Sequence, residues 1–307
     1  MQNLKPILAY VNPVYCYYVI FYYVSIFLAP VLGIESVWQV CWNTIRECLG
    51  DDIDVYTVWF MNIYTIAIYW IFGLAIIAME KFEIPKNFKS YQIRTKPSEI
   101  EQGDNYYKVT RDVLRNQLLA FAVSVLINKF DKNSLGLKIT PEVPSFYITM
   151  RDLMICLLLQ ETLFYYCHRT LHHRKFYWLH KKHHEFTSPA SITAEYCGVT
   201  EHFVCNLFPV VIGLKIFGSH YTTALLFWTS IIITTLIDHS GYNLLHFHSP
   251  EVHMHHHTKL VNYFLFECHL MLVYIIYRFN VNYASKFLSQ LNGTYYEESV
   301  KKEKVDS

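Results

Sequence analysis

The sequence predicts an all-α integral membrane protein, a bundle of about four transmembrane helices that carries a histidine-rich cap on its cytosolic side. The 307 residues are 53% hydrophobic and 17% aromatic, which is more apolar than an ordinary soluble enzyme. Several apolar runs are long enough to cross a bilayer as helices. All sixteen histidines lie between His168 and His269, so the polar chemistry is concentrated in one part of the chain.

The first two predicted spans set the orientation in the membrane. Residues 14–33 form an uncharged run that predicts a retained anchor rather than a cleaved signal peptide, and residues 56–79 form the second span. The interval between them holds five acidic residues and one basic residue, whereas residues 80–115 hold eight lysines and arginines. By the positive-inside rule, the basic segment faces the cytosol and the acidic interval faces the lumen.

A second hairpin is expected from residues 118–130 and 146–167, which returns the chain to the cytosolic side at His168. Two further apolar stretches within residues 201–236 fit either a re-entrant hairpin or the apolar walls of a cap. Residues 264–277 are apolar but span only three to four helical turns, and residues 300–307 form a charged tail. The eight cysteines show no CxxC pair, which favours reduced, buried thiols.

Ten histidines fall in three short clusters, HRTLHH, HKKHH and HMHHH. Imidazole suits zinc, copper, iron and nickel. On a helix, positions three and four apart share a face, so the HxxHH units within residues 180–184 and 253–257 are each expected to point one way. His168 and His172 are also four apart, and the spacing leaves open whether His172 or His173 binds. A further imidazole comes from the DHSGYN stretch. The candidate metal ligands are His168, His172, His173, His180, His183, His184, His239, His253, His256 and His257.

The motifs HRTLHH, HKKHHEF, DHSGYN and HMHHH, in this order and spacing, resemble the histidine boxes of the membrane-bound fatty acid hydroxylase and sterol desaturase superfamily. The likeness includes ETLFYY before the first box, EH after the second and SPE before the third, and it covers about residues 110–263. It is greatest to the fatty acid hydroxylase domain-containing proteins and the C4-methylsterol oxidases. On this resemblance, residues 1–115 form a transmembrane hairpin and cytosolic loop, 116–280 the histidine-box domain and 281–307 a C-terminal tail.

The resemblance implies a non-haem di-iron centre that activates O₂ in a multi-pass protein of the endoplasmic reticulum membrane. Its electrons would come from NAD(P)H through a separate cytochrome b5-type donor and its reductase, since the chain has no Gly-rich nucleotide motif. The substrate would be a sterol or fatty acyl lipid from the bilayer. The net charge of +1 and the lack of a basic stripe give no support for a nucleic-acid partner.

The leading interpretation is a lipid monooxygenase acting on a sterol, with fatty acyl or sphingolipid hydroxylation as the alternative. A catalytically weak metal-binding scaffold is also open, because Asn243 stands where relatives often have Asp or His, and FLFECHLMLVYIIYRF replaces the usual family ending. A zinc-binding transporter would place histidines inside spans or in a flexible loop, which is not the pattern here. Four acidic residues near the boxes are expected either to orient imidazoles or to be solvated: Glu161, Glu185, Glu195 and Glu201.

Overall fold

In a computed structural model, the described part of the chain comprises residues 36–244 and 250–259, and it is helical. Within those residues the only extended pairings are two isolated bridges, Gln92 with Tyr242 and Lys138 with His220. The predicted all-α class is confirmed. The predicted span at residues 14–33, the apolar segment 264–277 and the charged tail lie outside the described residues.

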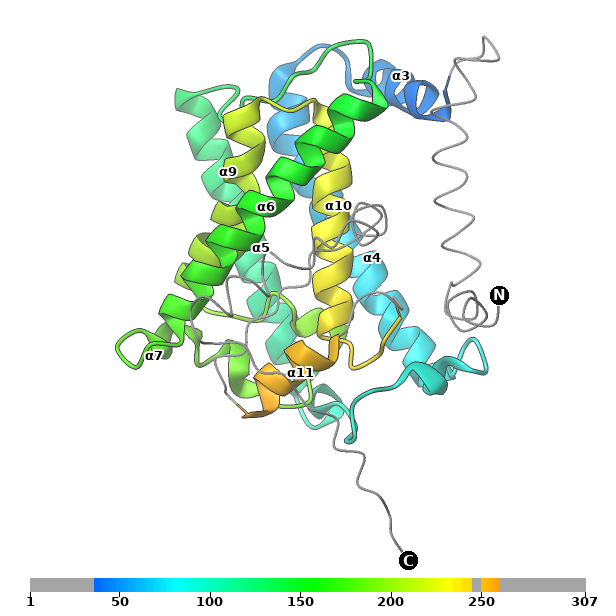
Figure 1. The fold of residues 1–307 in the computed structure, drawn as a ribbon, viewed down its shortest axis with the longest axis vertical. Helices are drawn as coiled ribbons and strands as arrows, with labels where there is room; N and C mark the ends of the chain where they lie inside the picture. The colour runs from blue at the N-terminus through cyan, green and yellow to red at the C-terminus, as the bar shows by residue number, and fades with distance from the viewer. Residues whose placement is uncertain (1–35, 245–249, 260–307) are drawn as a thin grey trace, which may run out of the picture.

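Long helical segments run alternately up and down the described bundle (Figure 1). They are η1–α4 (Val55–Phe60 and Met61–Phe82), α5 (Asn105–Phe130), α6 (Phe146–Leu171), α8–η6–α9 (Val199–Glu201, His202–Leu207 and Phe208–Phe217) and α10 (Tyr221–Asp238). α6 packs along α9, and α10 packs along α4. One end of the bundle therefore collects the C-termini of α4, α6 and α10 together with α11 (Pro250–Lys259), and we call it the histidine end. α3 (Val37–Leu49) lies at the opposite end, the far end.

Four segments are long and apolar enough to cross a membrane: Val55–Phe82, Asn105–Phe130, Val199–Phe217 and Tyr221–Asp238. The prediction of about four such helices is confirmed, although the set differs in detail. The stretches within residues 201–236 are two such helices in sequence. α6 is a full helix where a span is predicted but is not among the four, and its sequence carries Arg151, Asp152 and Glu161.

Helix α5 begins at Asn105, well before the apolar run at residues 118–130. Its first half is polar because side chains there bind other parts of the protein. Asp112 is buried and forms an ion pair with Lys182, which lies within the second histidine cluster, HKKHH. Asn116 is buried too and donates from Nδ2 to the Cys197 carbonyl (3.2 Å). These side chains connect α5 to the segment after the second cluster. The last part of the predicted cytosolic loop 80–115, residues 105–115, is thus the start of α5.

Short elements cover the histidine end. They are η2 (Phe88–Tyr91), η3 (Glu99–Glu101), α7 (Tyr177–His180), η4 (His183–Glu185) and η5 (Ser191–Thr193). Arg94 holds this cover in place: it is buried, pairs with Glu80 and donates to the carbonyls of Pro189 (3.1 Å) and Ser240 (3.2 Å). Its guanidinium also lies over the Tyr242 ring. One buried cation therefore links the segment between α4 and α5 to the chain just after α10.

Aromatic packing closes the far end. Trp42 of α3 donates its indole N–H to the Thr140 carbonyl (2.8 Å) and stacks with Tyr221, whose hydroxyl donates to the Tyr56 carbonyl (2.8 Å). The ring of His220 contacts Trp42 edge-on, and its side chain caps the first turn of α10. His220 therefore has a structural role at the end opposite the other described histidines, as its isolation from the clusters indicates.

Candidate metal centre

Nine of the ten predicted ligand histidines meet at the histidine end, each delivered by the end of an element or by a short one. His168 and His172 come from the last turn and cap of α6, and His239 is the C-cap residue of α10. The second cluster lies on α7 and η4, and the third lies on α11. The ends of α6 and α10, the short elements α7 and η4, and α11 all lie at this end of the bundle. Histidines that are far apart in sequence are therefore close together in space.

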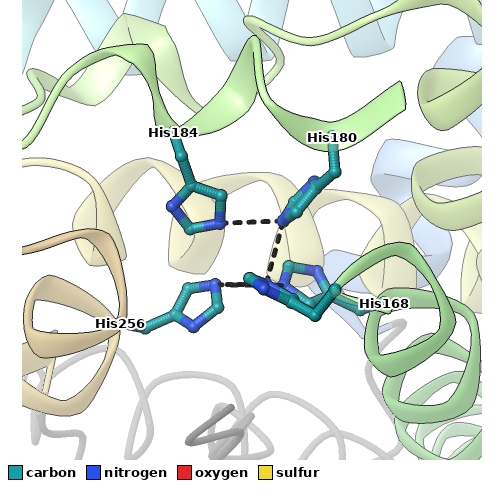
Figure 2. Close-up of side chains that lie close together, drawn as sticks. His168, His180, His184 and His256 are labelled. Carbon is teal, nitrogen blue, oxygen red and sulfur yellow. Dashed lines mark hydrogen bonds between the residues drawn. The ribbon is translucent and has the colours of Figure 1, made fainter. Parts of the chain in front are cut away.

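Five imidazoles form the first group, group A, with ligand nitrogens all within 4.8 Å of one another: His168, His172, His180, His184 and His256. Figure 2 shows the rings of His168, His180, His184 and His256 turned toward a common centre from three different parts of the chain. The closest Nε2 to Nε2 distances are 2.8 Å between His184 and His180, and 3.0 Å between His168 and both His172 and His256.

Four imidazoles form the second group, group B, within the same 4.8 Å limit: His183, His239, His253 and His257. Nε2 of His253 lies 3.0 Å from that of His239 and 3.1 Å from that of His257, and His239 lies 3.4 Å from His183. The groups are adjacent, because the ring centroids of His184 in group A and His257 in group B are 4.8 Å apart. The arrangement offers two neighbouring sites rather than one.

The expectation that each HxxHH unit points one way is wrong. α7 ends at His180 and a 3-10 turn begins at His183, so His180 and His184 join group A while His183 joins group B. The third cluster divides for a different reason. On α11, neighbouring residues are rotated by about 100°, so His256 faces group A while His253 and His257, one turn apart, face group B.

His173 is the one predicted ligand that lies in neither group. Helix α6 ends at Leu171, and the turn that follows leaves His173 exposed, with its Nδ1 accepting from the Lys175 backbone N–H (3.3 Å). His172 is only partly exposed and faces His180 at 3.1 Å. Of the two adjacent histidines, His172 lies in group A and His173 does not.

The donor set fits metal ions on three counts. All eight close contacts within the groups join Nε2 to Nε2, an arrangement in which only one nitrogen of each pair can carry a proton. Metal–imidazole bonds of about 2.1 Å at right angles would place neighbouring nitrogens about 3.0 Å apart, close to these distances. Burial lowers the pKa of His172 to about 4 and also lowers the pKa of His183 and His184, so neutral imidazoles, the form that binds metals, prevail.

Two acceptors bind the Nδ1 atoms of histidines in the two groups. Nδ1 of His180 donates to Oε1 of Glu201 (2.5 Å), and Nδ1 of His239 donates to the Thr235 carbonyl (2.8 Å). Each bond leaves the Nε2 lone pair directed into its group. The sequence suggested Glu201 as one of four acidic candidates, but it gave no signal for Thr235, because a backbone carbonyl has no sequence signature.

The other acidic neighbours have different partners. Glu185 pairs with Lys108 and accepts from the Tyr196 hydroxyl (2.7 Å), so it joins α5 to the cover. Glu195 accepts from Nε2 of Gln117 (2.8 Å) at a half-buried position, and burial raises its pKa to about 7. Glu161 is buried in α6. Glu201 contacts a group histidine, His180, so this acidic residue is placed to orient an imidazole.

A small cavity opens beside the groups and is lined by both of them. Its walls include His168 from group A and three members of group B, and the remaining lining is mainly apolar: Tyr69, Phe164, Leu207, Val210, Trp228, Ile231 and Ile232. A molecule in this cavity would be in direct contact with histidines of both groups. We call it the site cavity.

Comparison with known proteins identifies the chain. The fatty acid hydroxylase family profile matches residues 153–277. Fatty acid hydroxylase domain-containing protein 2 from Homo sapiens is 31% identical over 225 residues, which are 72% of this chain and 67% of that protein. The chain belongs to the fatty acid hydroxylase family. The membership predicted from the histidine boxes is confirmed.

Other proteins are similar to the chain over shorter regions. Fatty acid hydroxylase ahd1 from Mycosarcoma maydis is 35% identical over 161 residues, 52% of this chain and 42% of that protein. Methylsterol monooxygenase 1 from Gallus gallus is 33% identical over 107 residues, 34% and 35% of the two chains. No solved structure matches the chain. The region matched by the family profile contains every histidine of groups A and B.

Proposed function

We propose that this protein is an O₂-dependent, non-haem di-iron monooxygenase that oxidises a C–H bond of a sterol, as in C4-methylsterol oxidation. The observation that carries the proposal is the convergence of nine Nε2 atoms in two adjacent groups beside a largely apolar cavity. Eight or more neutral nitrogens can hold two divalent ions with positions left for O₂, whereas a structural zinc site closes with four ligands.

In this proposal group A and group B each hold one iron ion, and the bound metals supply the activation of O₂ for attack on the lipid. Glu201 and the Thr235 carbonyl keep the Nδ1 proton on His180 and His239, so that the Nε2 lone pairs stay available. The largely apolar surface of the site cavity suits the hydrocarbon around the reacting carbon. These roles need no other acid or base from the chain.

The proposal places the histidine end at the cytosolic face of the endoplasmic reticulum membrane. The basic segment 80–115 enters the described bundle at the same end as both groups, in line with the positive-inside rule. Electrons would reach the site from NAD(P)H through a cytochrome b5-type donor and its reductase, because the sequence has no nucleotide-binding glycine motif.

Fatty acyl hydroxylation is the second candidate, favoured by the similarity to fatty acid hydroxylase domain-containing protein 2 and fatty acid hydroxylase ahd1. Both reactions use the same metal groups and differ in the lipid that the cavity accepts. A substrate screen therefore separates them, with a 4-methylsterol, a fatty acyl lipid and a ceramide offered to the same enzyme.

The test is the metal content of the detergent-purified protein by plasma mass spectrometry, followed by turnover with NADH, cytochrome b5 and its reductase. We expect close to two irons per chain and formation of an oxidised 4-methylsterol. Zinc in place of iron calls for anaerobic reloading with iron before the turnover assay, because N-donor sites do not select strongly for iron. Less than one metal per chain after reloading would contradict the di-metal site, and bound iron without any product would favour the scaffold interpretation.

A further inference from the structure

A second, larger cavity of about 420 Å³ lies between the candidate membrane spans α4, α5, η6–α9 and α10. Its walls include Met61, Ile66, Val123, Ile127, Val211 and Ile212. This volume is within the range of small-molecule sites, roughly 300–1,000 Å³. We call it the tail cavity, because an apolar space among membrane-spanning helices suits the hydrocarbon part of a lipid.

The tail cavity and the site cavity share five lining residues: Glu195, His202, Leu207, Trp228 and Ile232. The site cavity also touches group A and group B, while the tail cavity extends away from them toward Asn128 and Lys215 near the far end. A lipid lying in both cavities would therefore pass the shared residues on its way to the histidines. Two of those five residues, Glu195 and His202, are polar, and the other three are apolar.

Glu195 has a hydrogen-bond partner within the protein, whereas Nδ1 of His202 has none among the described residues. Both side chains can form a further hydrogen bond to a ligand. Oε2 of Glu195 accepts from Gln117 Nε2 (2.8 Å), and Oε1 of Gln117 accepts in turn from the Trp70 indole N–H (2.9 Å), which fixes the carboxyl group. His202 is only 2% exposed, and its Nδ1 has no hydrogen-bond partner in the described part of the chain. A buried polar atom without a partner costs free energy until a ligand or water supplies one.

We propose that Glu195 and His202 bind the hydroxyl group of a neutral lipid alcohol, whose apolar body fills the tail cavity. This inference rests on the proposed lipid oxidation and specifies its substrate class. A hydroxyl can donate to Glu195 and accept from His202 at once. A fatty acid carboxylate cannot donate when ionised, and it would add a second acid beside Glu195 in a buried space, which disfavours ionisation of both.

The placement also predicts which carbon reacts. The polar pair and the group histidines line the same small cavity, so the oxidised carbon should lie only a few bonds from the hydroxyl. A methyl group on the ring carbon next to a sterol hydroxyl meets this condition. A carbon far along an acyl chain does not, because it would lie in the tail cavity.

The experiment measures equilibrium binding to the full-length, as-isolated protein in lipid nanodiscs, with radiolabelled 5α-cholestan-3β-ol as the probe. Unlabelled 5α-cholestane, hexadecan-1-ol and hexadecanoate compete with it. Since a hydrogen bond to a charged group corresponds to about tenfold or more in affinity, the sterol should bind about tenfold more tightly than cholestane, and hexadecanol more tightly than hexadecanoate. In Glu195→Ala and His202→Ala, the ratio of the cholestane Kd to the sterol Kd should fall several-fold.

Two further variants act as controls. Glu142→Gln removes an exposed acid at the far end and should leave the hydroxyl preference unchanged. Ala120→Phe puts a large ring on the wall of the tail cavity and should weaken the sterol and cholestane alike. An unchanged hydroxyl preference in both Glu195→Ala and His202→Ala would overturn the inference, as would equal binding of cholestane and the sterol by the unaltered protein.

Failure of this inference can be distinguished from failure of the proposed function, because binding is read without turnover. Hydroxyl-selective binding in a protein that oxidises no lipid would support the lipid site and contradict the monooxygenase. Oxidation of a lipid with no dependence on the hydroxyl, in the presence of two irons per chain, would support the enzyme and contradict the assignment of Glu195 and His202.

Discussion

His183 and His184 are neighbours in sequence, yet the structure places them in different groups, and this difference can be tested by substitution. Replacing His183 with Ala leaves group B with three imidazoles. Replacing His184 with Ala leaves group A with four, as many as group B has when intact. We therefore expect His183→Ala to retain about one metal per chain and His184→Ala to retain close to two, with the group A ion bound more weakly.

The magnitude follows from the number of ligands that remain. Loss of a partner that only orients a ligand already lowers metal affinity by about 10–100-fold, so loss of a direct ligand from a four-membered group should lower it by at least that much. Metal per chain is measured by plasma mass spectrometry after timed dialysis against a chelator. His173→Ala is the matched control, because His173 is exposed outside both groups, and it should keep both ions. Equal losses in His183→Ala and His184→Ala, or loss in His173→Ala, would refute the assignment.

Three further predictions concern residues around the groups. Glu201→Ala removes the acceptor for Nδ1 of His180 and should lower the affinity of group A by about 10–100-fold in a metal-competition titration, whereas Glu201→Gln, which keeps an acceptor oxygen, should lose less. Gly241→Ala should destabilise the protein by about 1–3 kcal/mol in thermal unfolding, because Gly241 has φ +76° and a Cβ there would lie 2.5 Å from Cδ of Arg94. Burial raises the pKa of Glu195 to about 7, so the folded state binds more protons than the unfolded state between about pH 4.5 and 7, and this contribution to stability is lost as pH rises. Glu195→Gln should therefore stabilise the protein relative to wild type more at pH 8 than at pH 5, and an equal effect at both would contradict the shift.

The sequence predicted the chemistry of the site better than its geometry. Imidazoles at recurring spacings indicate a metal site whatever the backbone does, because few other roles require so many neutral nitrogens. Their division into two groups depends on where helices end. α7 ends at His180 and a 3-10 turn begins at His183, so the two side chains join different groups, and no residue in KKHH signals that break.

The bundle was predictable where apolar residues face lipid and not where polar residues face the protein. The run at residues 56–79 anticipated most of the span Val55–Phe82. The start of α5 at Asn105 could not be seen, because Asp112 and Asn116 belong to a helix but bind the cover over the histidine end. A hydropathy profile shows that such residues are polar, but it cannot show that they are buried against partners far away in the sequence.

The most direct test of the account is an iron-edge anomalous difference map, or a cryo-electron microscopy map, of the metal-loaded protein. The account predicts two separate peaks, one surrounded by His168, His172, His180, His184 and His256, and the other by His183, His239, His253 and His257. A single peak, or a peak bound jointly by His180, His183 and His184, would contradict it.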